Sequence, residues 1–211
     1  MKIFVNFLSA FRIAASLLII PTIMLSWYWV TFILYALGAI SDWFDGYLAR
    51  KYNCCSKIGG VMDHIGDKLL VCNTLILLPL VILDMALNTT NIVSMLWNVV
   101  VPVILMIDRE LYVSGLREFL GTQKIEMPVP KARFSLGKVK TTIQMISLAA
   151  FLLLFAIGTS ITLTTSSRFV FYLIYILPQI GIFCLWFALV ASLWSATQYT
   201  FTFIEKLKKI K

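Results

Sequence analysis

Charged side chains are scarce in this sequence. Only 13% of its 211 residues are Asp, Glu, Lys or Arg, whereas 60% are hydrophobic, and it contains a single histidine. The mean hydropathy is +0.91. This composition excludes an ordinary soluble globular domain and is typical of a protein that crosses the membrane several times.

Cysteine is limited to four positions, and none of them has the spacing of a zinc site. Cys54 and Cys55 are adjacent, in a segment that we expect to face the cytoplasm, where disulfides are rare. The sequence therefore offers no argument for a zinc centre or for a disulfide framework.

Six apolar stretches approach the roughly 20 residues that a helix needs to cross the hydrocarbon core. The first contains Arg12 and has no small-residue cleavage site, so we expect it to remain as a helix. Six spans use most of the chain, which predicts a single all-α membrane domain over residues 1–211, a six-transmembrane-helix bundle. The stretches cover residues 8–25, 28–48, 60–83, 92–116, 139–158 and 169–195.

Basic residues exceed acidic ones by eight, and they are unevenly distributed. They gather around residues 50–57, 117–140 and 206–211, whereas residues 25–29 and 84–91 contain no Lys or Arg. By the positive-inside rule both termini are cytoplasmic, in a bacterial-type cell membrane. Because the basic segments are short and juxtamembrane, anionic membrane lipids and phosphorylated substrates are favoured as partners over nucleic acid. The most polar segment, 117–140, is expected to connect the fourth and fifth spans.

Four aspartates nevertheless stand close together within apolar sequence. Asp42 and Asp45 are three residues apart, and Asp63 and Asp67 are four apart, on either side of a short polar turn at residues 52–56. On helices, both spacings place the two carboxylates on one face. Antiparallel helices that meet at this turn bring their faces together, so we expect one carboxylate cluster at the cytoplasmic end of a helical hairpin.

Such a cluster of hard oxygen ligands suits Mg²⁺, Mn²⁺ or Ca²⁺ better than zinc or copper. Carboxylates at membrane depth are costly and are usually kept for a function. A pair of divalent ions is one means of clamping the oxygens of a transferred phosphate group. A single aspartate at a helix end has a simpler explanation, as a helix cap or as the partner of a lysine. Four at this spacing, with glycines between them, favour a metal site.

The full pattern, D-x2-D-G-x2-A-R-x8-G-x3-D-x3-D, resembles the signature of the CDP-alcohol phosphotransferase family. The resemblance implies a six-helix membrane bundle that usually forms a homodimer. It implies transfer of a substituted phosphate from a CDP-linked donor to an alcohol, with release of CMP and with Mg²⁺ or Mn²⁺, as two ions. The residues that match the motif are the metal ligands Asp42, Asp45, Asp63 and Asp67, of which Asp67 is also the general base, and the donor-binding residues Asp42, Gly46, Ala49, Arg50 and Gly59.

Further segments resemble those family members that transfer a phosphatidyl group from CDP-diacylglycerol to sn-glycerol 3-phosphate and form phosphatidylglycerophosphate. They are residues 6–12, 107–118, 137–145 and 193–199. The acceptor is a dianion, so the reaction requires a cationic pocket. The candidates for binding its phosphate group are Arg109, Arg117, Lys138 and Lys140.

These candidates have competing explanations. Arg109 lies inside an apolar stretch, where it either binds the acceptor or pairs with Asp108 or Glu110. Lys138 and Lys140 are either substrate ligands or markers of the cytoplasmic side.

The reaction has alternatives as well. Inositol phosphate, serine or phosphatidylglycerol is an alternative acceptor for a member of the same family. From another class, intramembrane aspartates also occur in divalent-cation transporters. A transporter needs acidic residues along a path across the bilayer, whereas here they gather at one cytoplasmic end, which favours the transferase.

Overall fold

The computed structural model describes residues 2–52, 57–86, 92–122, 136–161 and 168–208. All regular structure in these ranges is α-helical, which confirms the all-α part of the predicted fold class. Each predicted span falls on one helix, and only the first runs past its helix, by one residue. The helices are α1 (Lys2–Met24), α2 (Tyr28–Tyr52), α3 (Lys57–Ala86), α4 (Ile92–Thr122), α5 (Leu136–Ile161) and α6 (Arg168–Lys208).

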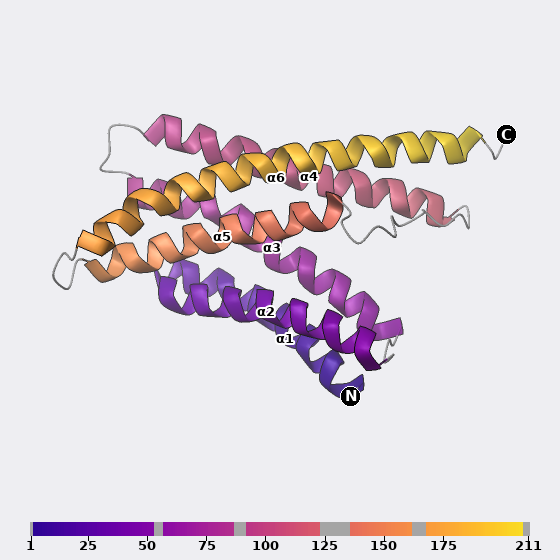
Figure 1. The fold of residues 1–211 in the computed structure, drawn as a ribbon, viewed down its shortest axis with the longest axis horizontal. Helices are drawn as coiled ribbons and strands as arrows, with labels where there is room; N and C mark the ends of the chain where they lie inside the picture. Colours follow the sequence, from indigo (N-terminus) through magenta and orange to yellow (C-terminus); the bar gives the residue numbers. More distant parts are fainter. Residues whose placement is uncertain (1, 53–56, 87–91, 123–135, 162–167, 209–211) are drawn as a thin grey trace.

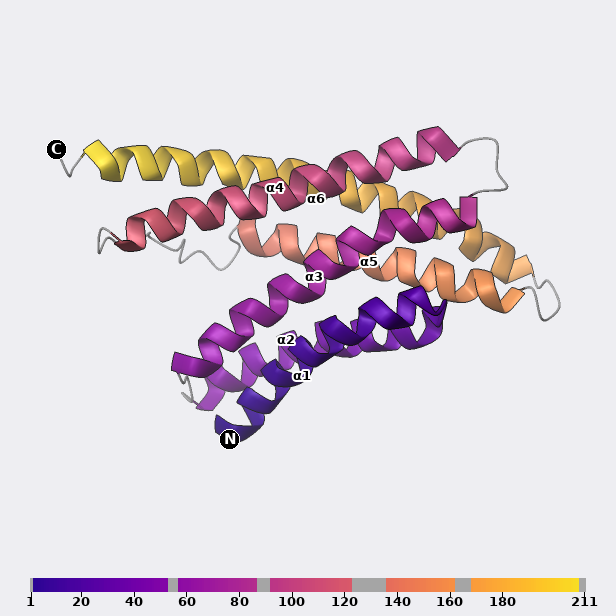
Figure 2. The same cartoon turned by 180° about the vertical axis from the view of Figure 1, so that it is seen from behind.

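The helices form a bundle in which α3 connects two groups (Figure 1). On one side α1 packs against α2 and α3, and on the other α6 packs against α4 and α5. Seen from behind, α3 runs diagonally from the α1–α2 pair to α4 (Figure 2). The first helix begins and the last helix ends at the same end of the bundle, where α2 also ends and α3 begins (Figure 1).

Four of the described helices are long and apolar enough to cross a membrane: α1, α3, α5 and α6. The apolar part of α2, Tyr28–Asp42, is shorter. Every helix also extends beyond its predicted span at one end or both. Helix α4 continues to Thr122, so Arg117 lies on a helix and not in the polar connector where the sequence placed it.

The turn between α1 and α2 has a defined helix cap. The backbone N–H of Trp27 donates to the carbonyl of Thr22 at 2.8 Å, and that of Ser26 donates to Ile23 at 2.9 Å. This pair of bonds is the Schellman pattern. Ser26 has a φ of 57°, in the left-handed region where glycine is favoured. The cap satisfies the last carbonyls of α1 and reverses the chain within three residues.

Close packing of α5 against α6 depends on Gly181. The Ser147 hydroxyl on α5 donates to the Gly181 carbonyl at 2.7 Å. A Cβ at Gly181 would lie 2.7 Å from Cε2 and 2.8 Å from Cζ of Phe151, whose ring is buried. Phe151 also stacks on Phe155, at 6.4 Å between ring centroids, so its ring cannot shift freely. Only a hydrogen atom fits at this position.

We therefore expect Gly181→Ala to destabilise the bundle by about 1–3 kcal/mol, the usual cost of overpacking a core. Gly158→Ala is the matched control, because a Cβ there meets nothing within 4 Å and alanine favours the helix by up to about 1 kcal/mol. Thermal unfolding in detergent measures both. Equal stability of the two variants would contradict the close approach of α5 and α6.

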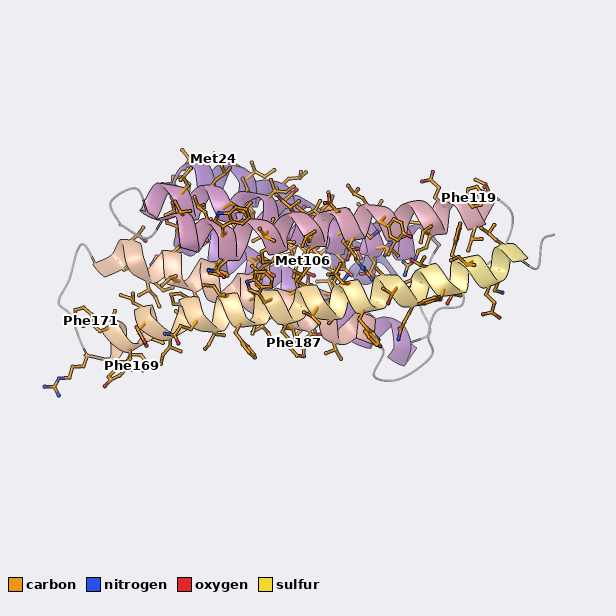
Figure 3. The ribbon with its side chains drawn as sticks, turned by 90° about the horizontal axis from the view of Figure 1, so that it is seen from above. Met24, Met106, Phe119, Phe169, Phe171 and Phe187 are labelled. Carbon is orange, nitrogen blue, oxygen red and sulfur yellow. The ribbon has the colours of Figure 1, made fainter. Side chains whose placement is uncertain are left out.

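The outward faces of the helices are strongly apolar. Phe171 and Phe187 project from α6 away from the neighbouring helices (Figure 3), and their exposed fractions are 60% and 51%. A soluble protein rarely leaves so many large apolar side chains exposed along one helix. These faces suit contact with lipid, in agreement with the composition.

Candidate active site

The carboxylates of Asp42 on α2 and of Asp63 and Asp67 on α3 meet at one place. One oxygen from each lies within 4.8 Å of the others. Their side chains are between 34% and 43% exposed, so the cluster is half-buried and open on one side. The structure thus brings together the two helix faces that the aspartate spacing predicted. Asp45 lies on α2 as expected, but its side chain is outside the described residues.

A guanidinium group lies at the centre of this cluster. Arg12, on α1, is fully buried. Its Nη1 is 3.2 Å from Oδ1 of Asp42 and 2.9 Å from Oδ1 of Asp63, and it also contacts Oδ1 of Asp67. The stem of Arg12 lies against Gly66, which allows α1 to approach α3 closely. No role was predicted for Arg12, although a lone arginine in an apolar helix itself indicates a functional or structural partner.

The cluster has the chemistry of a divalent-metal site. Its donors are carboxylate oxygens from two helices, the ligands that Mg²⁺ and Mn²⁺ prefer. The three carboxyl groups share a single cationic side chain, that of Arg12. Carboxylates this close repel one another unless cations balance them. The residues therefore fit a bound metal.

The predicted donor-binding residues flank the cluster. Gly59 is buried in the first turn of α3, one turn before Asp63. Gly46, Ala49 and Arg50 lie on the last turns of α2, and their side chains are outside the described residues. The backbone places all of them at the end of the bundle where α2 and α3 meet (Figure 1).

A second charged cluster joins α4, α5 and α6. The buried Arg109 donates from Nη1 to Oε1 of Glu110 at 2.9 Å, from Nη2 to Oγ of Ser195 at 2.9 Å, and from Nε to the carbonyl of Ser192 at 3.1 Å. Of the two explanations for Arg109, the structure shows the pairing with a neighbouring acid, which is Glu110. The same residue ties α4 to α6.

Lys140 reaches the same acid. It is buried on α5, and its ammonium contacts Oε1 of Glu110. A single glutamate thus holds two of the four predicted acceptor-binding cations. Lys68, the residue after Asp67, donates to Oγ of Ser114 on α4 at 2.7 Å and is close enough to Glu110 for their charges to interact. Neither Glu110 nor Lys68 was among the predicted site residues.

The two remaining candidate cations are placed differently. Arg117 donates from Nη2 to the Tyr199 hydroxyl at 2.7 Å, and its guanidinium lies 4.9 Å from the centroid of the Tyr199 ring. It is exposed, about two turns beyond Arg109 on α4. Lys138 lies on α5, and its side chain is outside the described residues. The structure thus groups Arg109 with Lys140 and sets Arg117 apart from them.

The two charged clusters are neighbours. His64 on α3 follows Asp63 and is close enough to Asp63, Glu110 and Arg117 for their charges to interact. This histidine therefore interacts electrostatically with charged residues of both α3 and α4.

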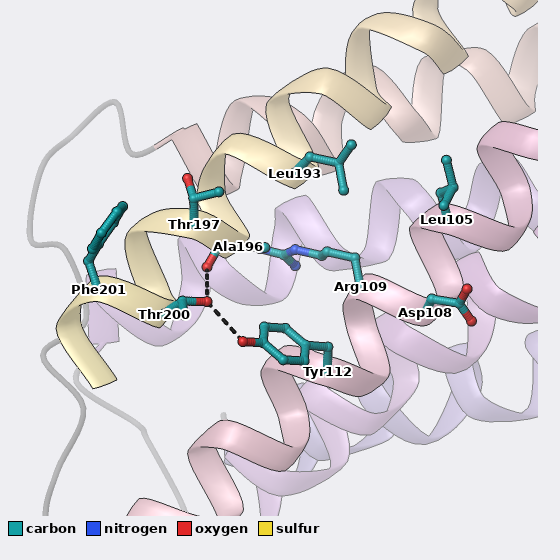
Figure 4. Close-up of a pocket in the computed structure, with 9 residues that line it drawn as sticks. All are labelled: Leu105, Asp108, Arg109, Tyr112, Leu193, Ala196, Thr197, Thr200 and Phe201. Carbon is teal, nitrogen blue, oxygen red and sulfur yellow. Dashed lines mark hydrogen bonds between the residues drawn. The ribbon is translucent and has the colours of Figure 1, made fainter. Parts of the chain in front are cut away.

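The lateral face between α4 and α6 carries a separate pocket of about 440 Å³. In it Arg109 extends toward α6, while Asp108 points away from Arg109 (Figure 4). The Tyr112 hydroxyl and the Thr200 hydroxyl are 3.1 Å apart across the pocket. The lining combines Asp108, Arg109 and three hydroxyl-bearing side chains with four apolar ones. It is lined by Leu105, Asp108, Arg109, Tyr112, Leu193, Ala196, Thr197, Thr200 and Phe201.

Comparison with known proteins agrees with this geometry. The family model described as CDP-alcohol phosphatidyltransferase matches residues 2–194. The chain belongs to this family. The resemblance that the aspartate pattern indicated is thereby confirmed, and the match includes both charged clusters. The chain is an enzyme of a family whose members act on CDP-linked alcohols.

Individual relatives are similar over most of their length. A protein of Rickettsia bellii is 37% identical over 155 residues, which cover 70% of this chain and 74% of the relative. One from Rickettsia typhi is 37% identical over 161 residues, covering 72% and 78%. One from Arabidopsis thaliana is 37% identical over 147 residues, covering 67% and 60%. All three are named as CDP-diacylglycerol–glycerol-3-phosphate 3-phosphatidyltransferases, the third with the number 2.

Proposed function

We propose that this protein transfers the phosphatidyl group of CDP-diacylglycerol to sn-glycerol 3-phosphate, giving phosphatidylglycerophosphate and CMP in the synthesis of anionic phospholipids. The observation that carries the proposal is the convergence of Asp42, Asp63 and Asp67 beside the buried cations of α4 and α5. The names of the relatives support both substrates.

The aspartates are the proposed metal ligands. Asp42, Asp45, Asp63 and Asp67 would hold Mg²⁺ or Mn²⁺, as two ions, which neutralise the diphosphate of the donor and the charge on departing CMP. Gly59 and Gly46 leave the backbone open beside this diphosphate. Arg50 supplies a cation for a phosphate oxygen. The proposed donor-binding residues are Asp42, Gly46, Ala49, Arg50 and Gly59.

Asp67 is the proposed general base. Its carboxylate removes a proton from the primary hydroxyl of sn-glycerol 3-phosphate, and the hydroxyl oxygen attacks the phosphorus that bears diacylglycerol. The bond from this phosphorus to the CMP oxygen breaks, and CMP leaves. The alternative is a covalent phosphodiester on an aspartate. One displacement inverts the configuration at phosphorus and two retain it, so a chiral donor distinguishes them.

The acceptor phosphate is proposed to bind at Arg109, Arg117, Lys138 and Lys140. The structure brings Arg109 and Lys140 together around Glu110. An arriving phosphate dianion then competes with Glu110 for both cations. Binding of the acceptor therefore rearranges an ion-pair network that already exists, and a neutral acceptor lacks the charge to do so.

In the membrane, we propose six crossings, both termini in the cytoplasm and the active site at the cytoplasmic face. Helices α1 and α6 begin and end at one end of the bundle (Figure 1), which supports an even number of crossings. The basic segments support the cytoplasmic orientation. We further propose that residues 1–211 form one domain and that two copies form a homodimer, as the family resemblance implies.

One assay tests the reaction. Purified protein in detergent is given CDP-diacylglycerol, Mg²⁺ or Mn²⁺ and one acceptor at a time, and CMP release is measured. We expect release with sn-glycerol 3-phosphate and none with inositol phosphate, serine or phosphatidylglycerol. Release with serine alone would contradict the acceptor assignment, and no release with any acceptor would contradict the transferase itself.

A further inference from the structure

Arg12 occupies the position in the carboxylate cluster where a cation is expected. A single atom, Nη1, contacts Oδ1 of Asp42, Oδ1 of Asp63 and Oδ1 of Asp67. Arg12 itself is fully buried, whereas the three carboxylates are each more than a third exposed. The guanidinium thus reaches the cluster from inside the bundle, and the carboxylates remain partly accessible.

Arg12 and a bound metal would both be held by the same three carboxylates. Mg²⁺ binds carboxylate oxygens at about 2.0–2.1 Å, at near-ideal octahedral positions. Nη1 is 2.9 Å from one of these oxygens and 3.2 Å from another. An ion held by all three oxygens and a nitrogen that contacts all three cannot share the centre of the cluster. One must leave for the other to bind.

We infer that Arg12 is the resident counter-cation of this cluster, and that a divalent metal binds to the three aspartates by displacing its Nη1. The inference rests on the proposed metal site and adds a positioning residue to it. Arg12 holds ligands from α2 and α3 at one point before the metal arrives. The displaced guanidinium remains anchored by its stem against Gly66 on α3.

This exchange has a direct consequence for metal affinity. In the wild-type protein, part of the binding free energy of the metal is spent on separating Arg12 from three carboxylates. Arg12→Met keeps an unbranched side chain of similar reach but removes the charge and the donors. We expect it to bind Mn²⁺ about tenfold more tightly than the wild-type protein, a difference of about 1.4 kcal/mol. Arg12→Lys, which keeps the charge but has a shorter reach, should fall between them.

The measurement is Mn²⁺ binding to full-length protein in detergent, followed by electron paramagnetic resonance of free Mn²⁺ and without either substrate. Equal or weaker binding by Arg12→Met would overturn the inference, because it would mean that Arg12 supports the bound metal. If neither the wild-type protein nor either variant binds Mn²⁺, both the displacement of Arg12 and the proposed metal site would be overturned. The CMP-release assay is independent of both outcomes, so a failure of the transferase proposal is recognised separately.

A second measurement uses the wild-type protein and does not depend on the folding of a variant. The protein is labelled with ¹⁵N-arginine, and the Nη resonances of Arg12 are followed by NMR. They are assigned as the resonances that are absent from the spectrum of Arg12→Lys. If this variant does not fold, the slow hydrogen exchange of a buried guanidinium identifies them instead. Saturating Mg²⁺ should shift them, since the ion pairs are lost. Arg12 resonances that stay unchanged at saturating Mg²⁺ would overturn the inference.

Discussion

Asp67→Asn is expected to lower the rate of CMP release by about 10²–10⁴-fold, the range that a positioned general base contributes. Asparagine has nearly the same size and shape as aspartate but does not accept the proton of the attacking hydroxyl. It also weakens one ligand of the proposed metal site. The remaining proposed ligands, Asp42, Asp45 and Asp63, would still hold metal for the donor diphosphate, so the KM for CDP-diacylglycerol should change much less than kcat.

The matched control is Asp108→Asn. Asp108 is an exposed aspartate on α4 that points away from Arg109 (Figure 4), and the same chemical change there should leave CMP release within about twofold, since it lies outside the carboxylate cluster. Initial rates at several concentrations of each substrate separate kcat from KM. Turnover by Asp67→Asn close to that of the control would remove Asp67 from the role of base.

Glu110→Gln is expected to destabilise the folded protein by about 3–5 kcal/mol, the cost of breaking a buried ion pair by removing one partner. Glu110 accepts from both Arg109 and Lys140, which are almost fully buried. Glutamine keeps the shape of the side chain but leaves both cations without a negative charge. The free energy of unfolding in detergent measures the loss.

Two comparisons make this result specific. Glu118→Gln changes an exposed acid on the same helix and should alter the free energy of unfolding by less than about 0.5 kcal/mol. The double variant Glu110→Gln with Lys140→Met removes one uncompensated cation and should recover part of the lost stability. No recovery in the double variant would mean that the contact between Glu110 and Lys140 contributes little to the fold.

The parts of this protein that the sequence could predict are those that depend on neighbours along the chain. Apolar stretches of sufficient length predicted all six helices, and the spacing of Asp63 and Asp67 predicted a shared helix face. The ends of α4 and α6 were not predicted, because hydropathy marks the apolar part of a helix and not its last hydrogen bond. Helix α6 continues to Lys208, past the predicted span that ends at residue 195.

The partners of the charged residues were less predictable, because they depend on which helices pack together. Arg12 is separated from Asp63 by 51 residues and from Asp67 by 55, and nothing local to any of them indicates the pairing. The same holds for Lys140 and Glu110, which are 30 residues apart. The sequence therefore identified most of the charged residues of the candidate site. Which of them pair with one another became visible only from the packing of α1 on α3 and from the contact of Lys140 on α5 with Glu110 on α4.

The pairing of Arg12 also bears on how the chain enters the membrane. Translation produces the arginine first and the last of its three carboxylates 55 residues later. A charged residue within a membrane helix costs about 2.5–3.5 kcal/mol to insert by itself, and so do the aspartates that follow. Arg12 meets all three carboxylates only when α1, α2 and α3 are assembled. The first three helices therefore constitute the smallest portion of the chain in which the arginine has its three aspartate partners.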